Sequence, residues 1–595
     1  MSQYVVGIDL GTSNSALAYA PLDEARLPIG LLELPQLVDV GVVERRRLLP
    51  SFLYIPAEAE TQAGGLGVPW DASGKLVVGA FARDHGAQVP DRLVSSAKSW
   101  LCHAAVDRRG PILPWGKGDD GVRKVSPLEA TARYLLHLRR AFEAAHPEAP
   151  LGQQRVILTV PASFDPGARE LTVEAARAAG LPNVVLLEEP QAAVYAWLEK
   201  RGESWRKELS VGDRVLVVDI GGGTTDFSLI DTVDEEGSLG LRRVAVGDHI
   251  LLGGDNMDYA LAFALKKELE EGGAALDAWQ MRVLVQACRA AKEALLLDED
   301  AGGPTSQAIL VPNRGAKLFK KNLKAELTRE RVLEVVLQGF FPSCGPDATP
   351  EQRRVGLTQL GLPYATDPAI TRHLAQFLTR HAREGEAFAL PTAILFNGGV
   401  LGSPAIQQRI TQVISTWLAE ADAPEARVLS GAELDVAVAR GAAAYGQARE
   451  GGGLRIRGGT ARTYYVGVEQ PMPAVPGYEP PVTAVCVAPF GMEEGTALDL
   501  PAQRFGLVVG QPARFRFFSS SVRKTDPIGS ELDPLPPDLE ELAPIETTLD
   551  GTAGAVVEVG LSAAVTPVGT LELSCVDAAA ERRWKLEFDV RDRAA

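Results

Sequence analysis

Two short segments of the sequence combine an acid, glycines and hydroxyl side chains. The first is Asp9-Leu10-Gly11-Thr12-Ser13-Asn14, and the second runs from Asp219 through Gly221, Gly222, Gly223 and Thr224 to Asp226. Glycine lets a backbone approach a phosphate closely, and exposed N–H and hydroxyl groups donate to its oxygens. An acid beside such a turn would repel a phosphate unless a cation lay between them. We therefore expect a phosphate site with Mg²⁺, held by Asp9 and Asp219 mainly through water.

One such segment alone is explained equally well as a simple hairpin turn. Two matching copies, whose aspartates lie 210 positions apart, and a further Gly398-Gly399 turn favour phosphate binding. The chain has no GxxxxGK[ST] sequence, which argues against a P-loop enzyme. It also lacks a GxGxxG turn with an acid about 20 residues later, so a dinucleotide site is disfavoured.

A pair of acids, Glu188 and Glu189, stands where an apolar run meets an alanine-rich segment. Glu189 could orient a water molecule or belong to the shell of the metal. The alternative is an acid at a helix start, where the helix dipole favours a negative charge.

The segments around the turns indicate the elements that must position them. Apolar runs at 4–8 and 16–19 flank the first turn, and runs at 214–218 and 227–230 flank the second. This pattern predicts strand, tight turn and strand, used twice, and hence two similar lobes. Further strands are expected at 155–160 and 392–397, each leading into a helix, and another helix at 276–297. Strands that alternate with helices indicate an α/β module up to about residue 449.

The pattern changes in the last quarter of the chain. Glycine-rich residues 451–459 read as a flexible linker. Beyond them, apolar Trp584, Leu586, Phe588 and Val590 alternate with charged residues, as in an antiparallel sheet with one buried face. We expect a nucleotide-binding domain of two lobes over 1–448, a linker over 449–460 and a β-sandwich over 461–595.

Composition excludes several classes of function. The 595 residues include 60 basic and 77 acidic side chains, a net charge of −17, which disfavours binding to nucleic acid. The five cysteines are far apart and form no CxxC pair, so neither a disulfide framework nor a zinc site is expected. The N-terminus does not resemble a signal peptide, and no apolar run approaches the roughly 20 residues of a membrane helix. We expect a cytoplasmic protein without membrane contact.

The motifs, taken in order, resemble the heat-shock protein 70 family. Residues 7–15 are similar to its first phosphate motif, and 219–226 to its second. The segment 156–164, which contains Pro161, and 189–193 are similar to its connecting segments. Residues 253–258, 397–399 and 435–443 are similar to its glycine pair at a helix start, its adenosine motif and its last segment before the linker. The resemblance spans 4–448, and the combination GIDLGTSNS, TVPASF and EEPQAA is specific to the chaperone branch of the actin-like superfamily.

The resemblance implies a two-lobed actin-like α/β ATPase domain followed by a peptide-binding β-sandwich. ATP would bind between the lobes with Mg²⁺ and K⁺ and be hydrolysed slowly. Gly11, Thr12, Ser13, Asn14, Gly221, Gly222, Gly223 and Thr224 would contact phosphates, and Lys292, Gly398 and Gly399 would lie near the adenosine. Glu189 and Asp226 would position the attacking water, and Pro161 would relay the nucleotide state. The implied partners are a client polypeptide and a co-chaperone or nucleotide-exchange factor, and the chain would act as a monomer.

The sequence departs from the family in several places. A family lysine that acts in catalysis is replaced by Arg83, and an arginine that stacks on adenine is replaced by Gly402. Arg83 keeps the charge needed to stabilise a γ-phosphate, but its planar guanidinium is not equivalent to an ammonium. The acidic, leucine-rich linker is not found, and we expect no helical lid, so bound peptides should exchange quickly. The stretch 341–390 has no counterpart.

Three functions remain open at this stage. The first is an ATP-dependent peptide-binding chaperone. The second is a nucleotide-gated scaffold that scarcely hydrolyses ATP and grips one dedicated partner, which Arg83, Gly402 and the altered linker motivate. The third is a small-molecule kinase of the same superfamily, although no catalytic acid beyond Asp219 and Asp226 suggests one.

Overall fold

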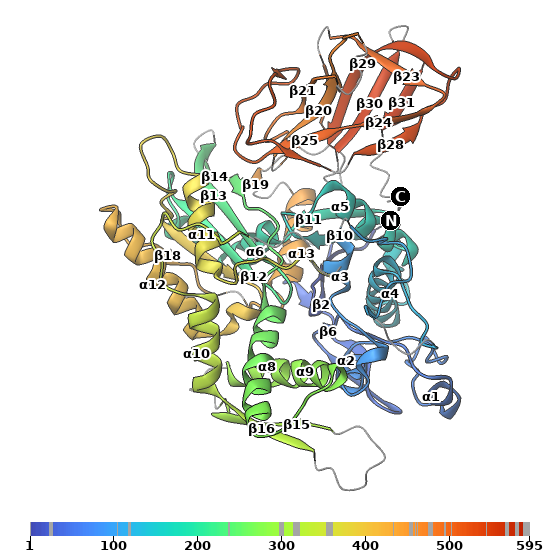
Figure 1. Ribbon diagram of the computed structural model, residues 1–595, viewed down its shortest axis with the longest axis vertical. Helices are drawn as coiled ribbons and strands as arrows, with labels where there is room; N and C mark the ends of the chain where they lie inside the picture. The colour runs from blue at the N-terminus through green and yellow to red at the C-terminus, as the bar shows by residue number, and fades with distance from the viewer. Residues whose placement is uncertain are drawn as a thin grey trace.

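The computed structural model shows two α/β lobes and a β-sandwich (Figure 1). It describes residues 2–22, 28–103, 105–116, 121–235, 238–296, 303–312, 322–352, 361–431, 433–451, 456–457, 460, 462–473, 480–492, 496–500, 503–542, 544–565, 571–577 and 582–586.

The first lobe is built on a sheet in which a hairpin is extended by parallel strands. Strand β1 pairs antiparallel with β2 on one side and parallel with β10 on the other, and β11 continues the parallel part. These runs are almost wholly buried because helices cover the sheet, so their sequences are continuously apolar. The strands are β1 (Tyr4–Leu10), β2 (Asn14–Pro21), β3 (Gly30–Leu31), β6 (Leu49–Pro50), β10 (Arg155–Val160) and β11 (Val184–Glu188).

The second lobe repeats this arrangement. Strand β12 pairs antiparallel with β13 and parallel with β17, and β18 extends the parallel part. The strands are β12 (Arg214–Ile220), β13 (Thr225–Glu235), β14 (Ser238–Val246), β17 (Ala393–Asn397), β18 (Arg427–Val428) and β19 (Ile456–Arg457). The repeated turn signature therefore corresponds to two lobes with the same strand connectivity, as expected.

Helices α6 (Glu189–Arg201) and α13 (Ala437–Gly451) join the lobes at the centre of the molecule. They cross very closely, since a Cβ atom on Gly441 would lie 1.7 Å from the Ala192 carbonyl oxygen. Strand β1 also approaches α13 directly, because a Cβ atom on Gly7 would lie 2.2 Å from the Ala439 oxygen. Glycines at these contacts fix the distance between the lobes.

Each lobe carries its own apolar core and further elements around its sheet. In the first lobe these are α1 (Glu58–Ala63), α2 (Ala80–Gly86), α3 (Ala97–Leu101), α4 (Pro127–Ala145), α5 (Pro166–Ala178) and the short strands β4 (Leu34–Asp39), β5 (Val42–Arg46), β7 (Leu53–Tyr54), β8 (Val77–Val78) and β9 (Leu93–Val94). In the second they are α8 (Gly254–Glu271), α9 (Ala278–Leu295), β15 (Ser306–Val311), β16 (Leu323–Thr328), α10 (Arg329–Phe340), α11 (Ile370–Arg380) and α12 (Pro404–Glu420).

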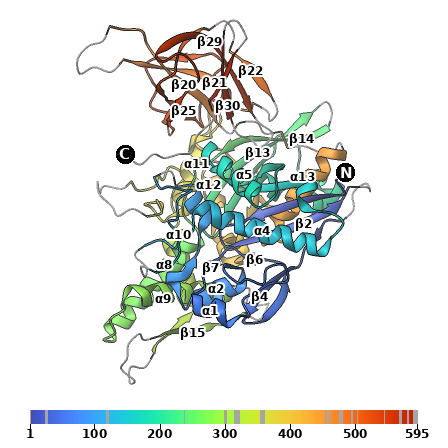
Figure 2. The same ribbon diagram turned by 90° about the vertical axis from the view of Figure 1, so that its right-hand side faces the viewer.

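The C-terminal module is a sandwich of antiparallel strands around one core. One sheet has the order β26 (Glu531–Leu532), β21, β20, β25 and β27 (Glu540–Glu541). The other contains β22 (Ala497–Asp499), β29, β30 and β31, with β23 (Phe505–Val509) beside β29. In both views the sandwich occupies one end of the long axis, and α9 and β15 lie toward the other (Figures 1 and 2). The main strands are β20 (Thr463–Glu469), β21 (Val482–Ala488), β25 (Phe517–Ser520), β29 (Ala555–Val565), β30 (Leu571–Asp577) and β31 (Arg583–Leu586).

The predicted fold class, an α/β two-lobed domain followed by a small β-sandwich, is confirmed. Within the segment expected to be a flexible linker, Ile456 and Arg457 pair with β14 as an edge strand. Phe588 and Val590, expected to continue the alternating pattern, lie outside the described residues. All five cysteines are free thiols. None of the described helices combines the length and hydropathy needed to cross a membrane.

Candidate phosphate-binding cleft

The two glycine turns face each other across one cleft. A Cβ atom on Gly222 would lie 2.0 Å from Ser13 Oγ, and one on Gly223 would lie 2.9 Å from Thr12 Cγ2. The cleft has a volume of about 1010 Å³. Its walls include most of the predicted phosphate-binding residues, namely Gly11, Thr12, Ser13, Asn14, Gly221, Gly222 and Thr224, together with Asp9 and Asp219. The two acids that the sequence placed 210 positions apart therefore line a shared space.

Strand pairing positions both turns. In the first hairpin Leu10 pairs with Ser15, and in the second Ile220 pairs with Thr225, so each turn is only four residues long. The Gly221 N–H donates to the Thr224 carbonyl oxygen at 2.9 Å and closes the second turn. Each aspartate is the last residue but one of its strand, which directs its side chain toward the turn.

Several carboxylates gather at the base of the cleft. Burial, and the nearby Glu189 carboxylate, raise the pKa of Asp9 to about 7. Burial also raises the pKa of Asp219 well above its usual value, and Glu189 and Asp226 add to this effect. The amide of Asn397 donates to Asp219 at 2.7 Å and partly offsets it. Neighbouring carboxylates that resist ionisation together form a site that a cation would stabilise.

This donor set fits Mg²⁺ bound mainly through water. Among the residues that the structure describes, no three acidic, histidine or cysteine side chains are grouped closely enough to enclose a metal ion. Mg²⁺ characteristically keeps several waters and takes one or two carboxylates together with substrate phosphates. Asp9 and Asp219 would supply those carboxylates.

Glu189 has a cationic partner that the sequence analysis missed. It begins α6, and its carboxylate forms a hydrogen-bonded ion pair with Lys98 from α3. The exposed fractions of the two side chains are only 8% for Lys98 and 12% for Glu189. No local pattern around Lys98 distinguishes it from a surface lysine, so only the tertiary structure shows that it points into the cleft.

Asp226 is deeply buried and is not among the residues that line the cleft. Burial raises its pKa to about 7, and a hydrogen bond from Ser163 opposes the shift. His249 Nδ1 lies 2.7 Å from the same Ser163 Oγ. Burial lowers the pKa of His249 to about 4, so the ring is neutral at pH 7. Because Ser163 has one hydrogen and gives it to Asp226, His249 must donate from Nδ1 to Ser163.

The predicted nucleoside residues lie further along the same cleft. Lys292 donates to the Gly254 carbonyl oxygen at 2.9 Å and pairs with Asp258 at 2.6 Å. Gly398 has a φ of +89°, and a Cβ atom there would lie 2.3 Å from the Ile220 oxygen, so this close approach requires glycine. Gly399 and Gly402 also line the cleft.

Arg83 lines the cleft, but its guanidinium is engaged by a neighbour. Its Nε lies 2.7 Å from Asp84 Oδ1, and both residues belong to α2. The role in hydrolysis assigned to Arg83 stays a prediction.

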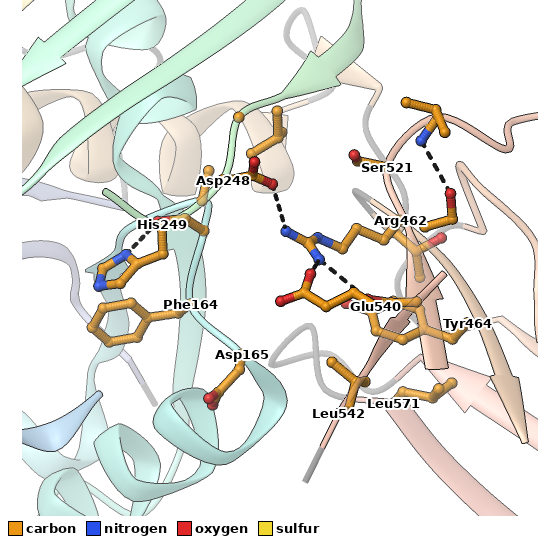
Figure 3. Close-up of a pocket in the computed structure, with 18 of the residues that line it drawn as sticks. Phe164, Asp165, Asp248, His249, Arg462, Tyr464, Ser521, Glu540, Leu542 and Leu571 are labelled. Atoms are coloured by element: carbon orange, nitrogen blue, oxygen red, sulfur yellow. Dashed lines mark hydrogen bonds and ion pairs between the residues drawn. The ribbon is translucent and has the colours of Figure 1, made fainter. Parts of the chain in front are cut away.

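Pro161 directly precedes residues that line a second cavity. It follows β10 and is buried, and the next residues, Ala162 and Ser163, line a cavity of about 720 Å³ between the first module and the sandwich. Figure 3 shows Phe164, Asp248 and His249 on one side and Arg462 and Tyr464 on the other. The cavity therefore begins beside Ser163, which holds Asp226.

Charged contacts cross this junction. Arg462 donates to Asp248 at 3.1 Å and also pairs with Glu540, as the dashed lines in Figure 3 show. Arg380 from α11 donates to the other Asp248 oxygen at 2.6 Å. Lys524 of the sandwich donates to the Val244 carbonyl oxygen at 2.6 Å. The stretch 341–390, which has no counterpart in the family, thus contributes α11 to the junction.

Comparison with known proteins identifies a family for part of the chain. Residues 68–342 match the Hsp70 protein family. The chaperone protein HscA of Pectobacterium carotovorum is 32% identical over 56% of this chain and 51% of its own length. An HscA homolog of Azotobacter vinelandii is 34% identical over 49% of this chain and 42% of its own length. An HscA homolog of Acidithiobacillus ferrooxidans is 32% identical over 57% of this chain and 48% of its own length. The chain spans about half the length of the curated relatives it matches.

Proposed function

Because this chain belongs to the Hsp70 family, we propose that it is an ATP-dependent molecular chaperone. ATP binds in the cleft between the lobes, and its hydrolysis controls how tightly the sandwich holds unfolded or dedicated client polypeptides. The observation that carries this proposal is the meeting of the two acid-tipped glycine turns across one cleft. Relatives named as chaperones support the client-binding part.

Different residues of the cleft bind the phosphates, the metal ion and the nucleoside of ATP. Backbone N–H groups of the turns at 11–14 and 221–224, with the Thr12 and Thr224 hydroxyls, hold the phosphates. Asp9 and Asp219 hold hydrated Mg²⁺, which neutralises the phosphate charge. Lys292, Gly398 and Gly399 contact the nucleoside, and K⁺ is the expected monovalent cation. Glu189 faces the phosphates and orients the attacking water. Asp226 supports that water from behind the cleft.

The junction supplies a physical route by which nucleotide state reaches the sandwich. Pro161 and Ser163 belong to one loop, and Ser163 joins Asp226 to His249. The residue before His249 is Asp248, which pairs with Arg462 of the sandwich. A change at the phosphates that moves Asp226 would therefore pass through Ser163 and His249 to Asp248, at the surface that contacts the sandwich.

A second candidate function is a scaffold that binds ATP but hydrolyses it very slowly. The observation in its favour is that Arg83, which replaces the catalytic lysine of the family, is engaged by Asp84. A single-turnover measurement separates the two functions, because a scaffold would keep its ATP through many hours while it held its partner.

The proposal is tested with the full chain and a Gly222→Ala variant. A methyl group at position 222 would press on Ser13 Oγ, so we expect nucleotide affinity to fall at least about tenfold, a loss of about 1.4 kcal/mol. Gly339→Ala, in α10 away from the cleft, serves as the matched control. Wild-type protein should also reduce aggregation of a diluted, denatured client more strongly in one nucleotide state than in the other. Wild-type protein that bound no ATP, or that left client aggregation unchanged in every nucleotide state, would overturn the proposal.

A further inference from the structure

Helix α3 and the residue before it carry three polar side chains near the cleft, of which Lys98 lines it. Ser96, which precedes the helix, donates to Asp255 of the second lobe at 2.8 Å. Lys98 pairs with Glu189. Ser99 lies against the second glycine turn, since a Cβ atom on Gly223 would be 2.7 Å from Ser99 Oγ. The segment 96–99, which we call the α3 turn, therefore contacts the second lobe, Glu189 and the second glycine turn.

Lys98 differs from the other basic side chains around the cleft. Arg46 pairs with Glu44, Arg47 with Glu433, Arg83 with Asp84, and Arg289 and Lys292 with Asp258. Among these cleft-lining cations in the described chain, Lys98 alone is paired with a member of the carboxylate group at the base of the cleft. Burial alone would lower its pKa, but the carboxylates of Glu189 and Asp9 raise the pKa of Lys98 above its usual value.

Ser99 provides an independent sign that this segment faces a ligand. Its exposed fraction is 1%, yet its hydroxyl has no hydrogen-bond partner among the described residues. A buried hydroxyl without a partner costs free energy, so such groups are normally satisfied. A phosphate oxygen held between the two turns would accept from it.

We propose that Lys98 is a catalytic residue whose ammonium contacts the terminal phosphate of bound ATP, and that Ser99 is a second donor to it. Lys98 takes the part that the resemblance to the family assigned to Arg83, and it comes from α3 instead of α2. This inference rests on the proposed function and adds to it the source of the cation.

The chemistry requires no proton transfer by Lys98. The bond between the γ-phosphorus and the bridging oxygen breaks, and the oxygen of water forms a new bond to phosphorus. ADP leaves with the bridging oxygen, inorganic phosphate is formed, and the displaced water proton is released to solvent. A fixed ammonium beside the terminal oxygens stabilises the charge that is spread over them in the transition state. Its ion pair with Glu189 holds that carboxylate beside the same phosphate.

The test compares Lys98→Gln with Arg83→Gln in the full chain. Lys98→Gln should lower the single-turnover hydrolysis rate about 100-fold or more, as expected for loss of one transition-state donor. Lys98→Arg should recover only part of the rate, because its fork cannot reproduce a point charge. If instead Arg83→Gln abolished hydrolysis while Lys98→Gln stayed within threefold of wild type, the inference would be wrong.

Binding measurements keep the inference testable even if hydrolysis is very slow. A contact to the terminal phosphate should make Lys98→Gln lose affinity for a non-hydrolysable ATP analogue while its affinity for ADP changes little. An unchanged ratio of the two affinities would sink the assignment of Lys98 and leave the proposed function intact. Wild-type protein that bound neither nucleotide would overturn both.

A second variant separates the loss of the phosphate contact from a loss of stability. Removing Lys98 alone leaves Glu189 buried without a partner, which is strongly destabilising. The double variant Lys98→Gln/Glu189→Gln removes both charges and should keep its thermal midpoint closer to that of wild type. It should show the same loss of preference for the ATP analogue over ADP. A double variant that kept the wild-type preference would also exclude contact between Lys98 and the phosphate.

Discussion

Arg462 of the β-sandwich donates a hydrogen bond of 3.1 Å to Asp248 of the second lobe. Asp248 is adjacent in sequence to His249, which contacts Ser163 and through it the buried Asp226. The junction between the two modules is therefore one peptide bond away from His249, whose partner Ser163 donates to the Asp226 carboxylate.

This relationship predicts that the Asp248–Arg462 pair contributes more to coupling between the nucleotide cleft and the sandwich than to the stability of the fold. The Asp248 side chain is 48% exposed, so the pair should contribute no more than about 1 kcal/mol to folding. Asp248→Ala should leave the thermal midpoint almost unchanged but reduce, severalfold, the difference in peptide release rate between the ATP and ADP states.

A charge exchange provides the control for this pair. Asp248→Arg/Arg462→Asp restores opposite charges and should regain part of the difference lost in either single variant. Arg380 and Glu540, which also contact the pair, limit the recovery. Single variants with full nucleotide control of peptide release would show that the contact does not transmit the signal.

Ser163 should set the pH at which hydrolysis begins. Burial raises the pKa of Asp226 to about 7 even though the hydrogen bond from Ser163 lowers it. Ser163→Ala removes the donor, so the pKa of Asp226 rises further and a smaller fraction is ionised at pH 7. We expect the acidic limb of the rate profile to move to higher pH, by up to about one unit. Single-turnover rates measured from pH 5.5 to 9 would show the shift.

The conservative replacement distinguishes this electrostatic effect from a packing defect. Ser163→Thr keeps the hydroxyl and should retain the wild-type position of the acidic limb even if its maximal rate is reduced. If both variants shifted the limb equally, the hydroxyl would not be its cause.

His137 should make the first lobe sensitive to acid. It lies in α4, is buried, and donates from Nε2 to the Pro35 carbonyl oxygen at 2.9 Å. Burial lowers its pKa to about 4, below the value of about 6.5 in an unfolded chain. The unfolded state therefore binds the proton more readily, and stability that is full above pH 6.5 is lost as the pH falls toward 4. At pH 5 the loss is about 2 kcal/mol.

The variant His137→Gln tests the predicted loss of stability at acidic pH. His137→Gln can still donate to Pro35 but does not titrate in this range. Its thermal midpoint should fall less than that of wild type between pH 7.5 and pH 5, even if it is lower at pH 7.5. Parallel losses in the two proteins would assign the acid sensitivity to other groups, such as His249 or His381, whose pKa values are also lowered by burial.

The sequence was sufficient for features that are encoded locally. The two turns each carry their acid, glycines and hydroxyls within eight residues, so their chemistry and their duplication could be recognised directly. Lys98, Ser163 and His249 could not be found this way, because each contacts a residue distant in sequence: Lys98 contacts Glu189, Ser163 contacts Asp226, and His249 contacts Ser163. The role given to Arg83 from its position in a motif stays a prediction, and the structure adds that Asp84, its neighbour, pairs with its guanidinium. Local patterns therefore predicted the glycine turns of the cleft but not the buried ion pair between Lys98 and Glu189.

The close packing of α13 against α6 at the centre of the molecule should make position 441 sensitive to mutation. Gly441 of α13 lies so close to α6 that a Cβ atom would stand 1.7 Å from the Ala192 carbonyl oxygen. Gly441→Ala must push the two helices apart, and overpacking of this kind costs about 1–3 kcal/mol or more. Gly339 lies in α10 with open space around its Cα, so Gly339→Ala should stabilise the protein by about 0.5–1 kcal/mol. Thermal midpoints that moved in opposite directions would support this account. A Gly441→Ala protein as stable as wild type would show that the lobes are not held at the distance set by this crossing.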